Sequence, residues 1–508
     1  MWTDKALASP ASMRVKGRSD RRRRRCRGRN LSEHVVTELG VAEPVLGGAA
    51  PPASGTLKRQ LTSFGVLLLA LSCLSPVFSV YGVGSDVLQH AGTGAAGLFV
   101  LGLGAAVVWA VVYAELGSAF PYAGGDYVGV GRILGRWAGV AALAIWAATA
   151  GPSVAFEAKI IATYVNELAP SLPAWTITFG SLALALGVAL TAVRTGALVT
   201  GLFLAVEMIA VMTLIGAGFI HPARGLHALI GHPMAVGAGG VLAPVSMSVL
   251  ALAALNAAYG TVGGNQAIGF GEELGDPHRK MGGVIVVACL FGAVTTALPV
   301  IAVLFGARDL VSVLRDPAPL AAFVSQTIGP WAGRALSAGV ALAIFNAMIA
   351  QVMFCGRLYF SLGRDRLFPE PVNRVLAGVD KGSGAPRAAT LVVGGYSACC
   401  CLLDTHTLLI FVSGLLVYGW GLVCLAVLVG RYKGLTGGQG YWRSPLFPAA
   451  PVVGLCMAVA FTIADLADAS AGRPSVILLG LVVAAAVTWS HFVLARRPGG
   501  WAPVLADE

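Results

Sequence analysis

SPVFSVYGVG, residues Ser75–Gly84, lies in the middle of an apolar stretch that runs from Leu61 to Leu88. The stretch is long enough to cross the hydrocarbon core of a bilayer, about 30 Å thick, as a helix. A proline, two serines and two glycines stand at its centre. Proline removes a backbone hydrogen bond and glycine is a poor helix former, so a continuous helix is disfavoured here. The sequence therefore predicts a membrane-spanning helix that is broken at its midpoint.

The composition of the whole chain indicates a membrane protein. Of its 508 residues, 56% are hydrophobic and only 12% are charged, and the mean hydropathy is +0.78. The charged fraction of a soluble protein is about twice as high. A transmembrane β-barrel would show alternating segments of about 10 residues, and the chain has none. We expect an all-α, multi-pass integral membrane protein.

Apolar runs of about 20 residues recur between clusters of charged or turn-forming residues. They predict twelve transmembrane helices, at about residues 61–89, 95–118, 134–166, 174–193, 197–220, 241–274, 281–305, 330–361, 387–404, 406–430, 448–467 and 474–495. Basic residues are concentrated in every second loop, which by the positive-inside rule places both termini in the cytoplasm. We expect the chain in the cytoplasmic membrane.

The segments outside the spans are short or strongly basic. Residues 1–60 hold thirteen of the 35 Lys and Arg residues and little apolar periodicity, which predicts a disordered cytoplasmic tail that touches anionic membrane lipid. Residues 496–508 form a cytoplasmic C-terminal tail. Because the charge is concentrated in tail and loops, we do not expect nucleic acid as a partner.

A second interruption lies in the sixth predicted span, LNAAYGTVGGNQAIGFGEELGDP (residues 255–277), where Gly260, Gly263 and Gly264 cluster. Five spans separate the two breaks, so equivalent spans in the two halves have opposite orientations, as in an inverted repeat. A matched pair of such breaks is typical of the midplane binding site of a transporter. The alternative is that each break is a kink relieved by neighbouring helices.

Three stretches resemble one known family. They are ELGSAFPYAGGDYVGVGRILG (Glu115–Gly135), GEELGDPHRK (Gly271–Lys280) and FNAMIAQVMFCGRLYFSLGRDRLFP (Phe345–Pro369). All three are similar to signatures of amino acid permeases of the amino acid/polyamine/organocation superfamily, and the similarity covers about residues 60–495.

The resemblance implies a LeuT-like five-plus-five inverted repeat with discontinuous helices 1 and 6. On this basis residues 61–430 form a ten-helix transport core, and residues 431–495 form two additional transmembrane helices. It also implies alternating access around a site between the first and sixth spans. One departure concerns the substrate: Val77, Phe78 and Ser79 replace the Gly-Ser-Gly-like turn that is frequent in the family.

Broken helices offer backbone groups to a zwitterionic amino acid, whose two charges cannot be buried without partners. We expect the amides of Phe78, Ser79 and Val80, at the positive end of the second half-helix, to bind the substrate carboxylate. We expect the carbonyls of Ser75 and Ala258, where the first half-helices end, to accept hydrogen bonds from the ammonium.

Side chains near the second break can set selectivity. Tyr259 lies where the family often has an aromatic gate, although a packed or interfacial tyrosine is the alternative. Thr261, Asn265 and Asn256 are its polar neighbours. Neither break contains Asp or Glu, which argues against a dicationic substrate.

Three sets of ionisable residues outside the breaks have open roles. Glu207 lies mid-span, where the resemblance places a lysine that replaces a sodium ion in some members, so it is either a proton-coupling residue or a structural partner. The resemblance implies that a sodium site would use hydroxyl groups of the eighth span. Sodium is less favoured, because NAMIAQVM (Asn346–Met353) in that span has none. Glu157 and Lys159 are two residues apart and do not face each other on a helix, so a structural role is favoured. The alternative is that Lys159 reaches the membrane interface and Glu157 faces the vestibule. His221, His227 and His232 lack metal-ligand spacing and predict a solvated loop.

The leading hypothesis is a secondary active transporter, a permease that moves amino acids by proton-coupled symport or exchange. An amine or polyamine transporter of the same fold and a transporter-like sensor without net flux are the alternatives. An enzyme is not expected, because HExxH, GxSxG and paired intramembrane histidines are missing. The expected partners are an amino acid or related amine, a proton and lipid, with no cofactor, metal or catalytic residue.

Overall fold

The computed structural model describes residues 61–122, 124–190, 197–220, 222–225, 231–237, 239–380 and 385–496. The two predicted tails, apart from Arg496, lie outside these residues. In the first half of the described chain the helices are α1 (Ser63–Leu74), α2 (Pro76–Phe78), α3 (Ser85–Ala91), α4 (Ala95–Ala119), α5 (Asp126–Leu134), α6 (Arg136–Asn166), α7 (Ala174–Leu190), α8 (Ala197–Ile220) and α10 (Met247–Gly260). The second half holds α11 (Pro277–Gly306), α12 (Leu310–Arg315), α13 (Pro319–Thr327), α14 (Pro330–Arg364), α15 (Glu370–Leu376), α16 (Arg387–Cys400), α17 (Thr405–Tyr432), α18 (Ala449–Ala467) and α19 (Gly472–Phe492).

Nine helical stretches of the described residues are long and apolar enough to cross a membrane. One of them, Ser63–Ala119, covers the first two predicted spans. The fourth and ninth predicted spans correspond to shorter helices, α7 and α16. Every predicted span therefore contains a helix, which confirms an all-α membrane protein, while the number of crossings stays a prediction.

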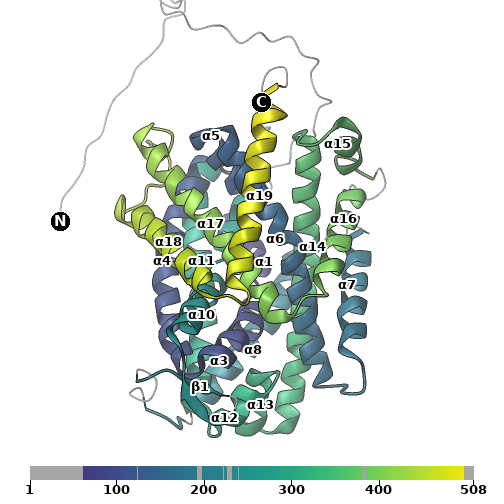
Figure 1. Ribbon diagram of the computed structural model, residues 1–508, viewed down its shortest axis with the longest axis vertical. Coiled ribbons are helices and arrows are strands. Elements are labelled where there is room, and N and C mark those ends of the chain that lie inside the picture. The colour runs from purple at the N-terminus through teal and green to yellow at the C-terminus, as the bar shows by residue number, and fades with distance from the viewer. Residues whose placement is uncertain are drawn as a thin grey trace, which may run out of the picture. The chain divides into compact units, whose positions relative to one another are not determined.

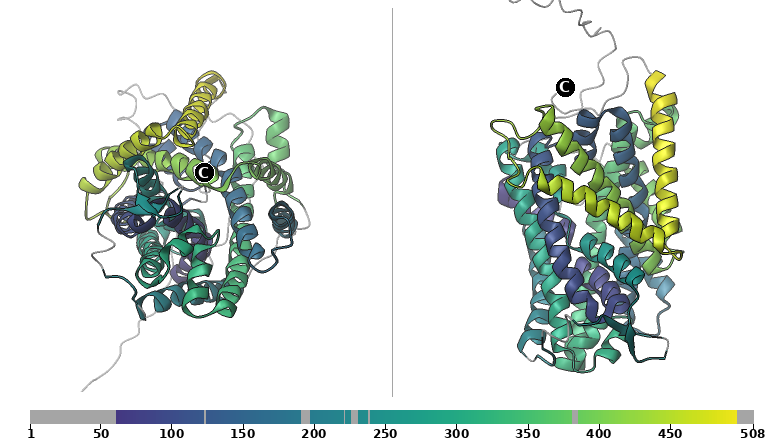
Figure 2. Two further views of the ribbon diagram at one scale, coloured as in Figure 1. Left: turned by 60° about the horizontal axis from the view of Figure 1, so that its bottom comes forward. Right: turned by 60° about the vertical axis from the view of Figure 1, so that its left-hand side comes forward.

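The long helices run roughly along the vertical axis of Figure 1. Helices α5 and α15 lie at its upper end, and α12 and α13 lie at its lower end together with a short hairpin. The hairpin pairs β1 (Met234–Val236) with β2 (Leu242–Pro244) in antiparallel register. Helices α18 and α19 lie along one side of the bundle in the two views of Figure 2.

The first predicted span is broken where the sequence indicates. Helix α1 ends at Leu74, and Ser75 has a φ of +41°, a conformation that is rare for a residue with a side chain. Pro76 follows at the first position of α2, where its missing N–H removes no hydrogen bond. A π-helical segment, Ser79–Gly84, then leads into α3.

The sixth predicted span is also broken. Helix α10 ends at Gly260, and the chain resumes as a 3₁₀ helix over Gly264–Glu273. Gly264 marks a close approach to α11, because a Cβ there would lie 2.5 Å from the backbone nitrogen of Cys289. The cluster of glycines thus ends one half-helix and lets the next pack against its neighbour.

A buried ion pair fixes the end of α17 to α4. Arg431 donates through Nε and Nη2 to the two carboxylate oxygens of Glu115, at 2.8 and 2.5 Å. The hydroxyl of Thr436 and the backbone N–H of Ser444 donate to the same carboxylate, each at 3.0 Å. Glu115 is fully buried, so its charge depends on these donors.

We expect Arg431→Met to lower the free energy of unfolding by about 3–5 kcal/mol, because it leaves the Glu115 carboxylate buried without its cation. Thermal unfolding in detergent measures the loss. The exposed Arg443 is the control, and Arg443→Met is expected to change stability by less than about 0.5 kcal/mol. Equal effects of the two variants would contradict the structural role of the pair.

Candidate functional site

A cavity of about 60 Å³ lies between the two broken helices. Four of the predicted substrate residues line it: Phe78, Ser79, Tyr259 and Asn265. A water molecule needs about 10–15 Å³ measured in this way, so the cavity holds about four to six waters. It is therefore a polar site of the size that a small solute fills.

The residues that line the cavity show where it lies relative to the two breaks. The lining includes Cys73 and Leu74, which precede the first break, Val262 and Gly263, which lie in the second break, and Gln266, which follows it. In Figure 1 helix α1 lies nearer to the upper end of the bundle than α3 does. The cavity therefore extends from the two breaks along the α1 side of the site.

Two predicted acceptors of the ammonium already have hydrogen-bond partners. The carbonyl of Ala258 accepts from the backbone N–H of Thr261 at 3.3 Å and from its hydroxyl at 2.9 Å. The carbonyl of Ser75 accepts from the N–H of Ser79 at 3.1 Å. A carbonyl oxygen has two lone pairs. The expectation of a free carbonyl is therefore wrong for Ala258, whereas Ser75 retains one lone pair.

Thr261 is a packing residue of the second break. Besides its bond to Ala258, its hydroxyl donates to the carbonyl of Gly102 on α4 at 3.0 Å. It is fully buried and is not among the residues that line the cavity. A direct side-chain contact between Thr261 and a substrate is thus not supported in this conformation. Val80 is also buried outside the lining, so only its backbone amide remains a candidate.

The carboxylate of Glu207 occupies the start of the second half-helix. Glu207 comes from α8 and is 1% exposed. Its Oε2 accepts from the hydroxyl of Ser75 at 3.0 Å and from the N–H of Val77 at 3.3 Å. The hydroxyl of Ser75 in turn accepts from the N–H of Phe78 at 3.3 Å. The positive end of this half-helix, predicted to bind the carboxylate of a substrate, is thus already close to a carboxylate of the protein.

Glu157 on α6 is the acidic side chain that lines the cavity. It is 5% exposed, and its Oε2 has no hydrogen-bond partner among the described residues. Its place in the cavity lining favours the alternative that Glu157 faces the vestibule. A buried carboxylate oxygen without a donor is unfavourable unless a ligand or solvent supplies one.

The sequence does hold a signal for Glu157. Thr149, Ser153 and Glu157 recur every four residues in the middle of α6, and all three line the cavity. Residues at this spacing share one face of a helix. Gln351 on α14 completes this polar wall, because its Nε2 donates to the hydroxyl of Ser153 at 3.3 Å.

The histidines that the sequence singles out are not the ones that the structure brings together. His221 and His227 lie outside the described residues, and His232 is exposed. His90 and His406, from distant parts of the chain, stack with ring centroids 3.9 Å apart.

The sequence model of the amino acid permease family matches residues 61–490, which include every element of the site. The chain belongs to the amino acid permease family. This membership confirms the resemblance that the three sequence stretches indicate. It also shows that the protein is a multi-pass membrane protein of a family that transports amino acids.

The chain is distantly similar in sequence to several proteins that are named as transporters. The permease is 27% identical to Asc-type amino acid transporter 1 of Mus musculus over 382 residues, which are 72% of this chain and 70% of that protein. It is 26% identical to the Homo sapiens protein of the same name over 438 residues, 82% of this chain and 78% of that protein. An uncharacterised transporter of Mycobacterium tuberculosis (strain ATCC 25618 / H37Rv) is 28% identical over 447 residues, 84% of this chain and 91% of that protein.

Proposed function

We propose that this permease is a secondary active transporter that moves an amino acid across the cytoplasmic membrane by alternating access. The observation that carries the proposal is the polar cavity between two matched helix breaks, lined by Ser79, Tyr259, Asn265 and Glu157. Both breaks lie five spans apart, which favours the inverted repeat that such transporters use. Twelve crossings, with α18 and α19 added to a ten-helix core, fit the order of the helices.

We place the upper end of Figure 1 in the cytoplasm. Cationic residues support this placement, because they gather on and beside α5 and α15. Those on the described residues are Arg132, Arg136, Arg364, Arg366 and Arg374. Helix α12 and its approach, at the lower end, carry Arg308 and Arg315. On this orientation the cavity faces the cytoplasmic side, and the structure corresponds to an inward-facing state.

We propose that Glu157 binds the ammonium of the substrate. The carbonyl of Ala258 is saturated, while Oε2 of Glu157 lacks a donor. A buried carboxylate requires a hydrogen-bond donor and a compensating positive charge. An ammonium supplies both, because it has three N–H donors and a positive charge. Glu157 supplies from α6 an acidic residue that neither break contains, so the lack of Asp and Glu in the breaks no longer argues by itself against a dicationic substrate.

Proton coupling through Glu207 follows from competition at the first break. Ionised, Glu207 accepts hydrogen bonds from Ser75 and Val77. A proton on Glu207 neutralises it and weakens its hold on these donors, which then become available to the carboxylate of a substrate. Proton and substrate would thus favour each other's binding, which is the requirement for symport.

Uptake into proteoliposomes tests the function. We expect labelled small amino acids to accumulate when the exterior is acidic relative to the lumen, and we expect hydroxy acids to be excluded because they lack the ammonium that Glu157 requires. A panel of amino acids, monoamines and polyamines separates the amino acid transporter from an amine transporter. Saturable binding without flux for every ligand would instead support a sensor.

A further inference from the structure

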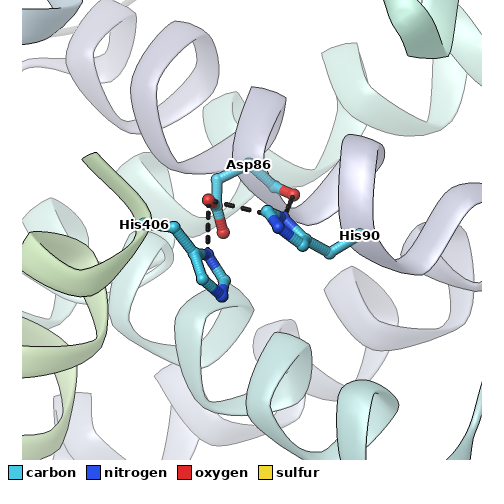
Figure 3. A group of neighbouring side chains, drawn as sticks. All are labelled: Asp86, His90 and His406. Atoms are coloured by element: carbon cyan, nitrogen blue, oxygen red, sulfur yellow. Dashed lines mark hydrogen bonds and ion pairs between the residues drawn. The ribbon is translucent and has the colours of Figure 1, made fainter. Parts of the chain in front are cut away.

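A compact group of three metal-ligating side chains lies at the lower side of the breaks, away from the cavity. Asp86 and His90 are on α3, and His406 is at the start of α17. Figure 3 shows the carboxylate of Asp86 between the two imidazoles. One ligand atom of each residue lies within 4.8 Å of the others.

The distances suit a single small ion. Nδ1 of His406 lies 2.8 Å, and Nδ1 of His90 lies 3.5 Å, from Oδ1 of Asp86. Ligands of a tetrahedral Zn²⁺ at about 2.0–2.1 Å stand a little over 3 Å apart. In the described conformation Nδ1 of His90 lies 2.9 Å from the backbone carbonyl of Asp86, and Nδ1 of His406 is hydrogen-bonded to Oδ1 of Asp86. A bound ion would replace these two contacts, which requires a small change in the orientation of both imidazoles. Two imidazoles and one carboxylate are a donor set that Zn²⁺, Co²⁺ and Ni²⁺ accept.

A second layer of hydrogen bonds holds the carboxylate. Nδ2 of Asn256 on α10 donates to Oδ2 of Asp86 at 3.2 Å, and the hydroxyl of Ser413 on α17 donates to Oδ1 of Asn256 at 2.8 Å. Oδ2 of Asp86 is thereby engaged, and Oδ1 is left toward the imidazoles. Outer partners of this kind orient the ligands in protein metal sites.

The cluster is accessible to an ion. The side chains of His90 and His406 are 40% and 31% exposed, whereas that of Asp86 is 10% exposed. Asp404, at the N-cap of α17 and two residues before His406, adds negative charge nearby. An ion can thus reach the imidazoles, and the carboxylate supplies a partly desolvated anionic ligand.

We propose that Asp86, His90 and His406 form a binding site for a divalent transition-metal ion of the Zn²⁺ class, with water as the remaining ligand. The bound ion would join α3 to α17. If the protein is the transporter proposed above, α3 and α17 separate when the lower side of the transporter opens. The effect on transport rests on that proposed function. Metal at the site would therefore stabilise the state in which that side is closed and inhibit transport.

Metal binding is tested on the purified permease in detergent, with its affinity tag removed. The probe is Co²⁺, whose visible absorption intensifies in a tetrahedral site, and titration of the Co²⁺ complex with Zn²⁺ gives the competition. We expect His90→Gln and His406→Gln each to weaken binding by more than about 100-fold. Asn256→Ala, which removes only the outer partner, is expected to weaken it by about 10- to 100-fold.

His232→Ala is the matched control, since this histidine is exposed and outside the cluster. It is expected to leave Co²⁺ affinity unchanged. Size-exclusion profiles show which variants fold. If one of His90→Gln, His406→Gln and Asp86→Asn does not fold, the other two still test the site. No saturable binding by the wild type, or equal affinity in the wild type and the Gln variants, would overturn the site.

Transport gives the second readout. Zn²⁺ added to the side that holds the cluster is expected to inhibit substrate uptake, and the His406→Gln variant is expected to lose this inhibition. If Co²⁺ binds and Zn²⁺ leaves uptake unchanged, the site stands and its inhibitory consequence is refuted. If no substrate is transported at all, the proposed function fails while the Co²⁺ titration still decides the metal site.

Discussion

Glu157→Gln is expected to weaken amino acid binding by about 2–5 kcal/mol, which is about 30- to several thousand-fold in affinity. Oε2 of Glu157 lacks a hydrogen-bond partner among the described residues, and the Glu157 residue lines the cavity with Ser79 and Tyr259. A neutral amide of the same size offers no charge to an ammonium, so the ion pair is lost while the shape is retained. Binding measured by isothermal titration, together with the KM of uptake, reports the change.

A substrate analogue provides the sharpest control for Glu157. The 2-hydroxy acid that corresponds to the substrate has no ammonium, so its weak binding should be the same in the wild type and in Glu157→Gln. Glu167→Gln, at an exposed acidic residue beyond the end of α6, is the matched variant and should bind the amino acid normally. If Glu157→Gln binds the amino acid as tightly as the wild type, another group recognises the ammonium.

Local sequence signals predict the two breaks, because each break depends on residues within the broken segment. Pro76 at the first position of a half-helix and the glycines near Gly264 act through the backbone of their own segment. No distant residue is needed to place such an interruption. The position of the candidate site in the chain therefore follows from the sequence, together with the four predicted residues that line the cavity.

The hydrogen bonds at the breaks could not be predicted in the same way. Ser75 and Glu207 are 132 residues apart, and their contact depends on how α8 packs against the break. The hydroxyl of Thr261 saturates the carbonyl of Ala258, a choice of rotamer that no spacing reveals. Polar groups at a helix break seek partners wherever packing supplies them.

The group formed by Asp86, His90 and His406 is even harder to predict from the sequence. Asp86 and His406 are 320 residues apart, and no motif spacing connects them. By contrast, Glu157 is detectable, since Thr149 and Ser153 share its helical face and mark it as polar. Periodicity within one helix reveals which face is polar, whereas a site that is built from two helices needs the fold.

The substitution Glu207→Gln tests whether Glu207 couples transport to proton movement. Glutamine is of similar size, and its carbonyl oxygen can accept the same hydrogen bonds from Ser75 and Val77 that Oε2 of Glu207 accepts. It cannot bind or release a proton in the physiological range. The variant therefore keeps the geometry of the first break and removes the group that we propose to titrate during the cycle.

In Glu207→Gln we expect pH-driven accumulation to disappear while exchange of labelled for unlabelled substrate persists. For one proton per substrate, each pH unit across the membrane drives about tenfold accumulation, or about 1.4 kcal/mol, and the variant should reach only equal concentrations on both sides. Exchange shows that the variant still binds and translocates, because a full cycle in both directions needs no net proton movement. Glu207→Asp, which keeps an ionisable group, should retain part of the accumulation. Tenfold accumulation by Glu207→Gln would assign the coupling to another group.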